Sequence, residues 1–209
     1  MNKLKTNLRV LAIVLVSLTI MSCKDSKKEH NNNDGHHSEV KKEIHTKMNH
    51  DSTSKKGTEA KVVNHQKNTA TSPIINGYIQ IKNGLVADDK DAAAKGGTAL
   101  LAAFAKFDMS TLSGETHKEY MEILESAKEQ SEHIVKSPID HQREHFEVLS
   151  ADISDLITLL GTEKTLYQDF CPMANNNKGA YWLSEVENIK NPYFGAKMMK
   201  CGSVKKQIN

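Results

Sequence analysis

Four sulfur-bearing side chains in the C-terminal part of the chain have the types and spacing of a soft-metal site. Cys171 and Met173 stand at one end of a stretch, and Met198 and Cys201 stand at the other. Thiolate and thioether sulfur are the ligands that select Cu(I) over harder ions, whereas zinc has little use for methionine. The segments "NNNKG" and "NPYFG" between them are rich in turn-forming residues, so the two ends can fold back on each other. We therefore expect these four residues to be able to share one copper ion.

The same two cysteines permit a second interpretation, which the residues leave open. A disulfide between Cys171 and Cys201 would close a loop of about 30 residues, and the chain-entropy model gives such a closure about 3.5 kcal/mol. A disulfide and a copper-bound pair of thiolates exclude each other at any one moment. A third interpretation is that Met198 only packs, while Trp182 and its aromatic neighbours dock the segment on the rest of the protein.

Two histidines, His141 and His145, are four residues apart in a predicted helix and therefore lie on the same side of it. The helical pattern places His145 at the border of the apolar face and His141 further outward. This pair could complete the copper site. The segment "HQREH" lacks the glutamate that a zinc protease needs after the first histidine. The alternative is one boundary histidine and one solvated histidine without a ligand.

The sequence does not indicate an enzyme. Cys171 as nucleophile with His145 as base is the one catalytic arrangement to consider, and Pro172 denies the cysteine the helix N-terminal amide that often lowers a thiol pKa. Gly-rich phosphate loops, serine-elbow motifs and paired carboxylates do not occur in the sequence. The formal net charge is +2 and no basic patch stands out, so nucleic-acid binding is not indicated.

Four amphipathic helices are predicted to position these residues. Apolar residues recur at steps of three and four in four stretches, residues 73–88, 91–107, 114–136 and 138–160. Serine-proline pairs at Ser72 and Ser137 mark two helix starts, and Gly161 suits a helix end. Gly96 and Gly97 inside the second helix predict a close approach of another helix. No stretch alternates with the period of a strand, so we expect an all-α fold: an up-down four-helix bundle with an irregular C-terminal arm.

The N-terminal part of the sequence predicts export and a membrane tether. Residues 1–22 have the positive start and short apolar run of a signal peptide, and Cys23 follows in the position of a lipidated cysteine. An ordinary secretory signal is the alternative. Residues 23–72 are polar and predict a disordered tether, before a domain of residues 73–209. The tether contains six of the ten histidines, which either gather metal ions or are only polar filler.

Three segments resemble one bacterial family, a domain of unknown function found in exported lipoproteins and at the ends of periplasmic adaptor subunits of heavy-metal efflux pumps. The segments are "IKNGLVADD", "HQREHFEVLS" and the stretch from "LYQDFCPMANNNKG" through "NPYFGAKMMKCG". The resemblance covers about residues 74–204. The matching residues that it carries over are His141, His145, Cys171, Met173, Met198 and Cys201.

The resemblance implies copper or a similar soft ion, because the family occurs with heavy-metal efflux. It implies Met198 rather than Met199 as a ligand, since the latter stands where such domains often have an ordinary apolar residue. Efflux components would be the partners, and the cell envelope, on the periplasmic side or at the outer membrane, would be the location. The tether lies outside the resemblance.

Overall fold

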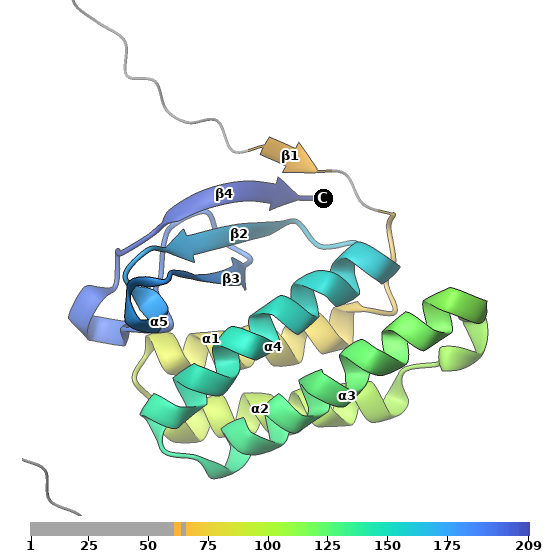
Figure 1. The fold of residues 1–209 in the computed structure, drawn as a ribbon, viewed down its shortest axis with the longest axis horizontal. Coiled ribbons are helices and arrows are strands. Elements are labelled where there is room, and N and C mark those ends of the chain that lie inside the picture. Colours follow the sequence, from red (N-terminus) through yellow and green to blue (C-terminus); the bar gives the residue numbers. More distant parts are fainter. Residues whose placement is uncertain (1–60, 64–65) are drawn as a thin grey trace, which may run out of the picture. The chain divides into compact units, whose positions relative to one another are not determined.

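The computed structural model describes residues 61–63 and 66–209, which form a mostly helical domain with a small sheet (Figure 1). The long helices are α1 (Ser72–Val86), α2 (Lys90–Lys106), α3 (Gly114–Lys136) and α4 (Ile139–Leu160). The strands are β1 (Lys61–Val63), β2 (Leu166–Cys171), β3 (Ala180–Ser184) and β4 (Ser203–Ile208). The short elements are the 3-10 turns η1 (Met109–Thr111) and η2 (Gly195–Met198) and helix α5 (Ala174–Asn177).

The four long helices form where the apolar periodicity predicts them. The Asp89 side chain accepts a hydrogen bond from the Ala92 amide and caps α2. Gly161, with a φ of 81°, ends α4. Successive helices pack on one another, α1 on α2, α2 on α3 and α3 on α4.

Glycines allow α1 and α2 to approach closely, which confirms the prediction made from Gly96 in the second helix. A Cβ atom on Gly96 would lie 2.4 Å from the Ile81 amide nitrogen, and one on Gly84 would lie 2.4 Å from the Ala93 nitrogen. Because both contacts are with backbone atoms, neither can relax by a side-chain rotation. The helix-propensity cost of these glycines is therefore offset by backbone packing.

The prediction of an all-α fold is confirmed in part: the described residues are mostly helical, but the C-terminal arm is not irregular, because it forms most of a small sheet. The strand order is β1-β4-β2-β3, with β4, β2 and β3 antiparallel and β1 parallel to β4. The up-down four-helix bundle is also not confirmed. Helices α1 and α4 make only a minor contact with each other, and the sheet lies over them, with α2 and α3 on the far side (Figure 1).

The folded part begins earlier than the predicted boundary at residue 73. The Asn68 amide donates to the Leu160 carbonyl at 2.9 Å, and the Thr71 hydroxyl donates to the Gly161 carbonyl at 3.0 Å. Residues before α1 thus satisfy carbonyls at the end of α4. Strand β1 also falls within the stretch predicted as tether. The predicted signal peptide, Cys23 and the remainder of the tether lie outside the described residues.

Aromatic side chains form the core between the sheet and the helices. The Tyr78 and Phe146 rings are stacked with centroids 5.1 Å apart, and Trp182 meets Tyr193 edge-on at 5.9 Å. The Tyr78 hydroxyl accepts from the Leu183 amide at 3.0 Å and contacts the Ser150 hydroxyl at 2.8 Å. One phenol therefore joins α1, α4 and β3. Within the described part of the chain, no helix has the length and apolar content needed to cross a membrane.

Candidate functional site

The two cysteines meet at one end of the β2–β4 pair. Phe170 lies opposite Ser203 in the antiparallel register, so Cys171, the last residue of β2, lies close to Cys201, which stands two residues before β4. Their Sγ atoms are 2.6 Å apart, although the residues are 30 positions apart in sequence. Cys171 is fully buried and Cys201 is half-buried. The sheet thus brings the two predicted sulfur ends together, as a pair of free thiols.

The thiol contact changes the acidity of Cys201. Its hydrogen bond with Cys171 is the largest cause of a raised pKa, and partial burial adds to it. The Met173 backbone amide points at the Cys201 sulfur and acts in the opposite direction. Because a metal ion binds the thiolate and not the thiol, binding here must release protons.

Both predicted methionine ligands line one cavity, whereas neither cysteine is among the residues that line it. The cavity has a volume of about 480 Å³, and its walls come from α4, the turn after β2 and the loop before β4. Met173 is 49% exposed and Met198 is half-buried. The Cys201 amide donates to the Met198 carbonyl at 3.0 Å, so these two residues occupy one tight turn. The structure therefore places all four predicted sulfur residues in one neighbourhood.

An unusual left-handed turn carries Met173 into this position. Asn175, Asn176 and Asn177 have φ angles of 49°, 53° and 65°. Asparagine tolerates this conformation better than other non-glycine residues, but usually as single residues. The side-chain amide of Asn175 also donates to the Glu147 carboxylate on α4 at 2.6 Å. The "NNN" sequence therefore folds the chain back directly after Met173 and fastens the turn to α4.

Asn191 positions Cys201 from the other side. It is fully buried, and its amide group donates to the Cys201 carbonyl at 2.8 Å. Its carbonyl oxygen accepts from the Tyr193 amide at 2.8 Å, and its backbone amide donates to the Met199 carbonyl at 2.9 Å. One buried side chain therefore links the start of the "NPYFG" loop to the turn that contains the second cysteine.

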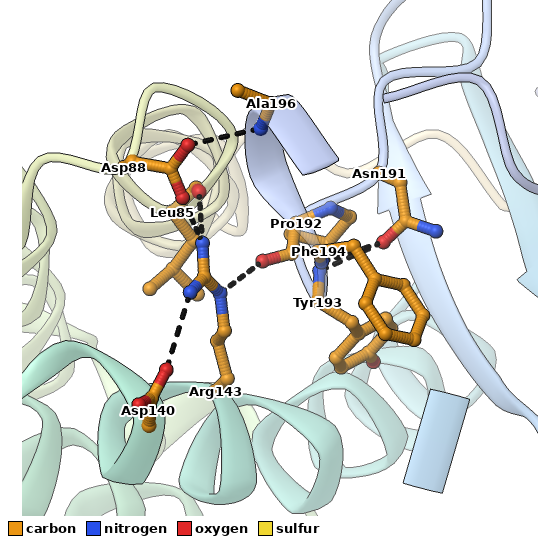
Figure 2. Close-up of polar contacts among 9 residues, drawn as sticks. All are labelled: Leu85, Asp88, Asp140, Arg143, Asn191, Pro192, Tyr193, Phe194 and Ala196. Atoms are coloured by element: carbon orange, nitrogen blue, oxygen red, sulfur yellow. Dashed lines mark hydrogen bonds and ion pairs between the residues drawn. The ribbon is translucent and has the colours of Figure 1, made fainter. Parts of the chain in front are cut away.

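Arg143 on α4 fixes the same loop to the helices (Figure 2). Its Nε donates to the Pro192 carbonyl at 3.0 Å, and its Nη2 donates to the Leu85 carbonyl at 3.1 Å and to the Asp88 carboxylate. Nη1 lies 3.5 Å from Asp140. The guanidinium contacts these groups through all three of its nitrogens, whereas a lysine has only one nitrogen from which to donate.

Asp88 completes this clamp at the end of α1. Its second carboxylate oxygen accepts from the Ala196 amide at 2.9 Å, as Figure 2 shows. The hydrogen bond from Ala196 and the one from Arg143 hold the Asp88 pKa below its usual value. Gly195 permits the approach, because a Cβ atom there would lie 2.2 Å from the Asp88 oxygen.

Asp169 in β2 is a buried carboxylate. Within residues 66–209, neither of its oxygens meets the full geometry of a hydrogen bond, and the same holds for Trp182 Nε1 on the paired strand β3. Burial raises the Asp169 pKa to about 7, and the Lys82 charge and the neighbouring Trp182 N–H offset only part of the effect. Lys82 is itself buried, which lowers its pKa. These groups lie inside the domain rather than at the cavity.

The two predicted histidines lie on the other side of α4. The α4 residues that line the cavity of Met173 and Met198 are Arg143, Glu144 and Glu147. At about 100° per residue, Arg143 and Glu147 are about 200° and 240° around the helix from His141, and Glu144 stands at the border, about 60° from it. His145 contacts Gln130 on α3 and His141, as described below. His141 is exposed and His145 half-buried, as the helical pattern predicted. In the described residues, no contact joins these histidines to either cysteine.

Sequence reasoning missed the residues that hold the sulfur pair in place. Asp88, Arg143 and Asn191 each stand inside one of the segments that carried the family resemblance. The sequence feature that could have identified them is a charged or amide side chain inside each of the segments "IKNGLVADD", "HQREHFEVLS" and "NPYFG". The three segments meet at one clamp.

Comparison with known proteins gives one match. Residues 74–165 match the family model described as "Protein of unknown function (DUF3347)". This part of the chain is therefore similar to a domain of unknown function. The match includes the four long helices with Asp88 and Arg143, and it ends before β2 and both cysteines. No curated protein and no solved structure matches the chain.

Proposed function

We propose that this protein is a lipid-anchored protein of the cell envelope that binds Cu(I) and serves in copper resistance or delivery. One observation carries the proposal: Cys171 and Cys201, far apart in sequence, bring their sulfur atoms together, and Met173 and Met198, two and three residues away from them along the chain, line one cavity. Export, the lipid on Cys23 and heavy-metal efflux components as partners are parts of the proposal that rest on the sequence. The six histidines of the N-terminal segment would gather ions.

The donor set fits a soft ion. Two thiols and two thioethers offer sulfur only, which Cu(I) prefers and which magnesium or calcium do not use. Two sulfurs that each lie about 2.3 Å from one ion are about 3.8 Å apart at a tetrahedral angle. The thiols must therefore separate by about 1 Å to bind an ion. Cys201 and Met173 lie in turns near the surface, where such a shift is possible.

The short distance between the thiols also favours a second candidate function. An interaction domain whose C-terminal part is fixed by a Cys171–Cys201 disulfide would need the same proximity. Its partner would be another envelope protein. In this case the cysteines would contribute stability, and the cavity would bind no metal.

Copper binding and free thiols together distinguish the two functions. The full-length Cys23→Ser protein is purified with and without reductant, its free thiols are titrated, and Cu(I) is added in competition with a colorimetric chelator. We expect tight binding of one Cu(I) to the reduced protein, lost in Cys171→Ser and weakened in Met198→Leu. Met121→Leu, an exposed methionine on α3, is the matched control. Absence of binding to the reduced protein would refute the copper proposal.

A further inference from the structure

Three histidines gather on the α3–α4 hairpin, and none of them lines the cavity of Met173 and Met198. Residues 66–209 contain four histidines, and only His117 lies apart from this group. The rings of His141 and His145 on α4 have centroids 4.5 Å apart. The ring of His133 on α3 is stacked on that of His145 at 4.3 Å with an interplanar angle of 14°. Sequence reasoning identified His141 and His145 but not His133.

The two α4 histidines already have the separation that a shared ion requires. His141 Nε2 and His145 Nε2 are 3.1 Å apart. Two nitrogens that each lie about 2.0–2.1 Å from one ion are about 2.8–3.4 Å apart, for bond angles from a right angle to the tetrahedral value. Within the described residues no group of three or more His, Cys, Asp or Glu side chains is arranged to hold an ion. The site is therefore a preformed pair that needs a further ligand.

Gln130 sets the tautomer of His145 in favour of metal binding. His145 Nδ1 lies 2.7 Å from Gln130 Oε1 on α3. An amide oxygen only accepts, so Nδ1 carries the proton and Nε2 presents its lone pair. Histidines that bind metals are oriented in the same way, by donating the second ring N–H to an oxygen of a neighbouring group.

Carboxylates around the pair favour a cation. Glu144 Oε2 lies 3.6 Å from His141 Nε2, and both Glu144 and Glu129 lie close enough to His145 to interact with it electrostatically. Glu144 can therefore supply the further ligand, with water in the remaining positions. The His141 side chain is 48% exposed, so an ion can enter from solvent.

We propose a second metal site, in which His141 Nε2 and His145 Nε2 bind a divalent transition-metal ion with the Glu144 carboxylate as third ligand. Imidazole and carboxylate ligands suit Cu²⁺ and Zn²⁺, and Cu²⁺ binds most tightly in the usual order of affinities. Neither histidine lines the cavity of Met173 and Met198, but Glu144 stands at the border and lines it. The nitrogen ligands are therefore separate from the sulfur residues.

Cu²⁺ binding to the full-length chain tests this proposal. Serine replaces Cys23, Cys171 and Cys201, and asparagine replaces the six histidines at positions 30, 36, 37, 45, 50 and 65, so that neither thiols nor the N-terminal segment compete. Calorimetry gives stoichiometry and affinity, and paramagnetic broadening of amide signals locates the ion. We expect one Cu²⁺, with broadening confined to the facing parts of α3 and α4.

Single substitutions identify the ligands. His141→Ala and His145→Ala should each weaken Cu²⁺ binding by at least about tenfold, and Gln130→Leu should weaken it by about tenfold through the lost orientation of His145. His117→Ala is the control and should change nothing. Circular dichroism checks the fold, and the exposed His141 decides the outcome if His145→Ala unfolds. Unchanged affinity in a folded His141→Ala protein, or broadening elsewhere, would overturn the proposal.

Discussion

Arg143 and Asp88 form an ion pair across 55 residues of sequence, and each also binds the loop that leads to Cys201. Arg143 holds the Pro192 carbonyl and Asp88 holds the Ala196 amide. The position of the second cysteine therefore depends on a charged pair between α1 and α4.

Replacing Arg143 should destabilise the domain. Its side chain is only 11% exposed, and its loss leaves the carbonyls of Leu85 and Pro192 without their donor. We expect Arg143→Ala to lower the free energy of unfolding by about 2–3 kcal/mol, measured by urea denaturation. Arg143→Lys should recover part of this loss. The control is Lys90→Ala, which breaks an exposed ion pair with Asp91 and should change the free energy of unfolding by less than about 0.5 kcal/mol. Equal stability of the Arg143→Ala and Lys90→Ala proteins would contradict the role of the clamp.

Gly195 should not tolerate a side chain. Gly195→Ala places a Cβ atom 2.2 Å from Asp88 Oδ1 at a φ of 53°, so it adds a clash to the strain of a positive φ. We expect a loss of about 2 kcal/mol or more in thermal or urea unfolding. Gly114→Ala is the matched control, because its φ is 43° and nothing lies within 4 Å of its Cβ position. It should cost about 1 kcal/mol. The prediction fails if the two variants lose the same amount.

Asp169 should make stability fall as pH rises. Its folded-state pKa of about 7 lies above the ordinary value of 3.8. Below about pH 4 the carboxyl is protonated in both the folded and the unfolded state and does not change the free energy of unfolding. Above about pH 7 it is ionised in both states and lowers the free energy of unfolding by its full amount. At 1.36 kcal/mol per pH unit, the penalty reaches about 4 kcal/mol. We expect Asp169→Asn to stabilise the protein at pH 8 and to have little effect near pH 4.

Unfolding in urea from pH 4 to pH 8 measures this difference. Asp155→Asn, an exposed aspartate on α4, is the control and should not stabilise the protein at pH 8. The double variant Asp169→Asn/Lys82→Met also removes the neighbouring charge and should lose the same pH dependence. A wild-type stability that rises between pH 5 and pH 8 relative to Asp169→Asn would have the wrong sign.

Oxidation should couple the cysteines and displace copper. In the Cys23→Ser protein, mild oxidant should join Cys171 and Cys201 in a disulfide within one monomer, so that no free thiol remains. The free energy of unfolding should rise by about 3.5 kcal/mol, as expected for a loop of this length. Thiol titration and urea denaturation measure the two effects. Cys201→Ser should show neither, and the oxidised protein should not bind Cu(I). Persistence of both thiols under oxidant would exclude the second candidate function.

The sequence predicted the helices well and the sheet not at all. Ile74, Leu100 and Phe146 each belong to an apolar stripe with a helical period on its own helix. Each of them is buried, as the pattern predicts. Strand β2 buries Asp169 as well as Leu166, and β3 buries Trp182, Leu183 and Ser184 in succession. Neither strand alternates cleanly between apolar and polar residues, so period-two reasoning had no signal to detect.

The candidate site was predicted in part. Sulfur chemistry pointed to Cys171 and Cys201, and the structure brings them into contact. Helical spacing joined His141 to His145 but could not show which side of α4 the cysteines would occupy. That information depends on the strand register, which places β2 and β4 side by side. Asn191 and Arg143 were missed because they hold backbone groups of distant residues, and such contacts leave no spacing in the sequence.

Strand β4 pairs with both β1 and β2, so it lies inside the sheet although it is formed by residues 203–208. A chain that emerges from the ribosome from its N-terminus can pack its helices before residues 203–208 are available, but the sheet is complete only once they are. Cys201 reaches Cys171 only at that last step. During synthesis, the two thiols therefore remain apart and open to other partners until the rest of the domain is in place.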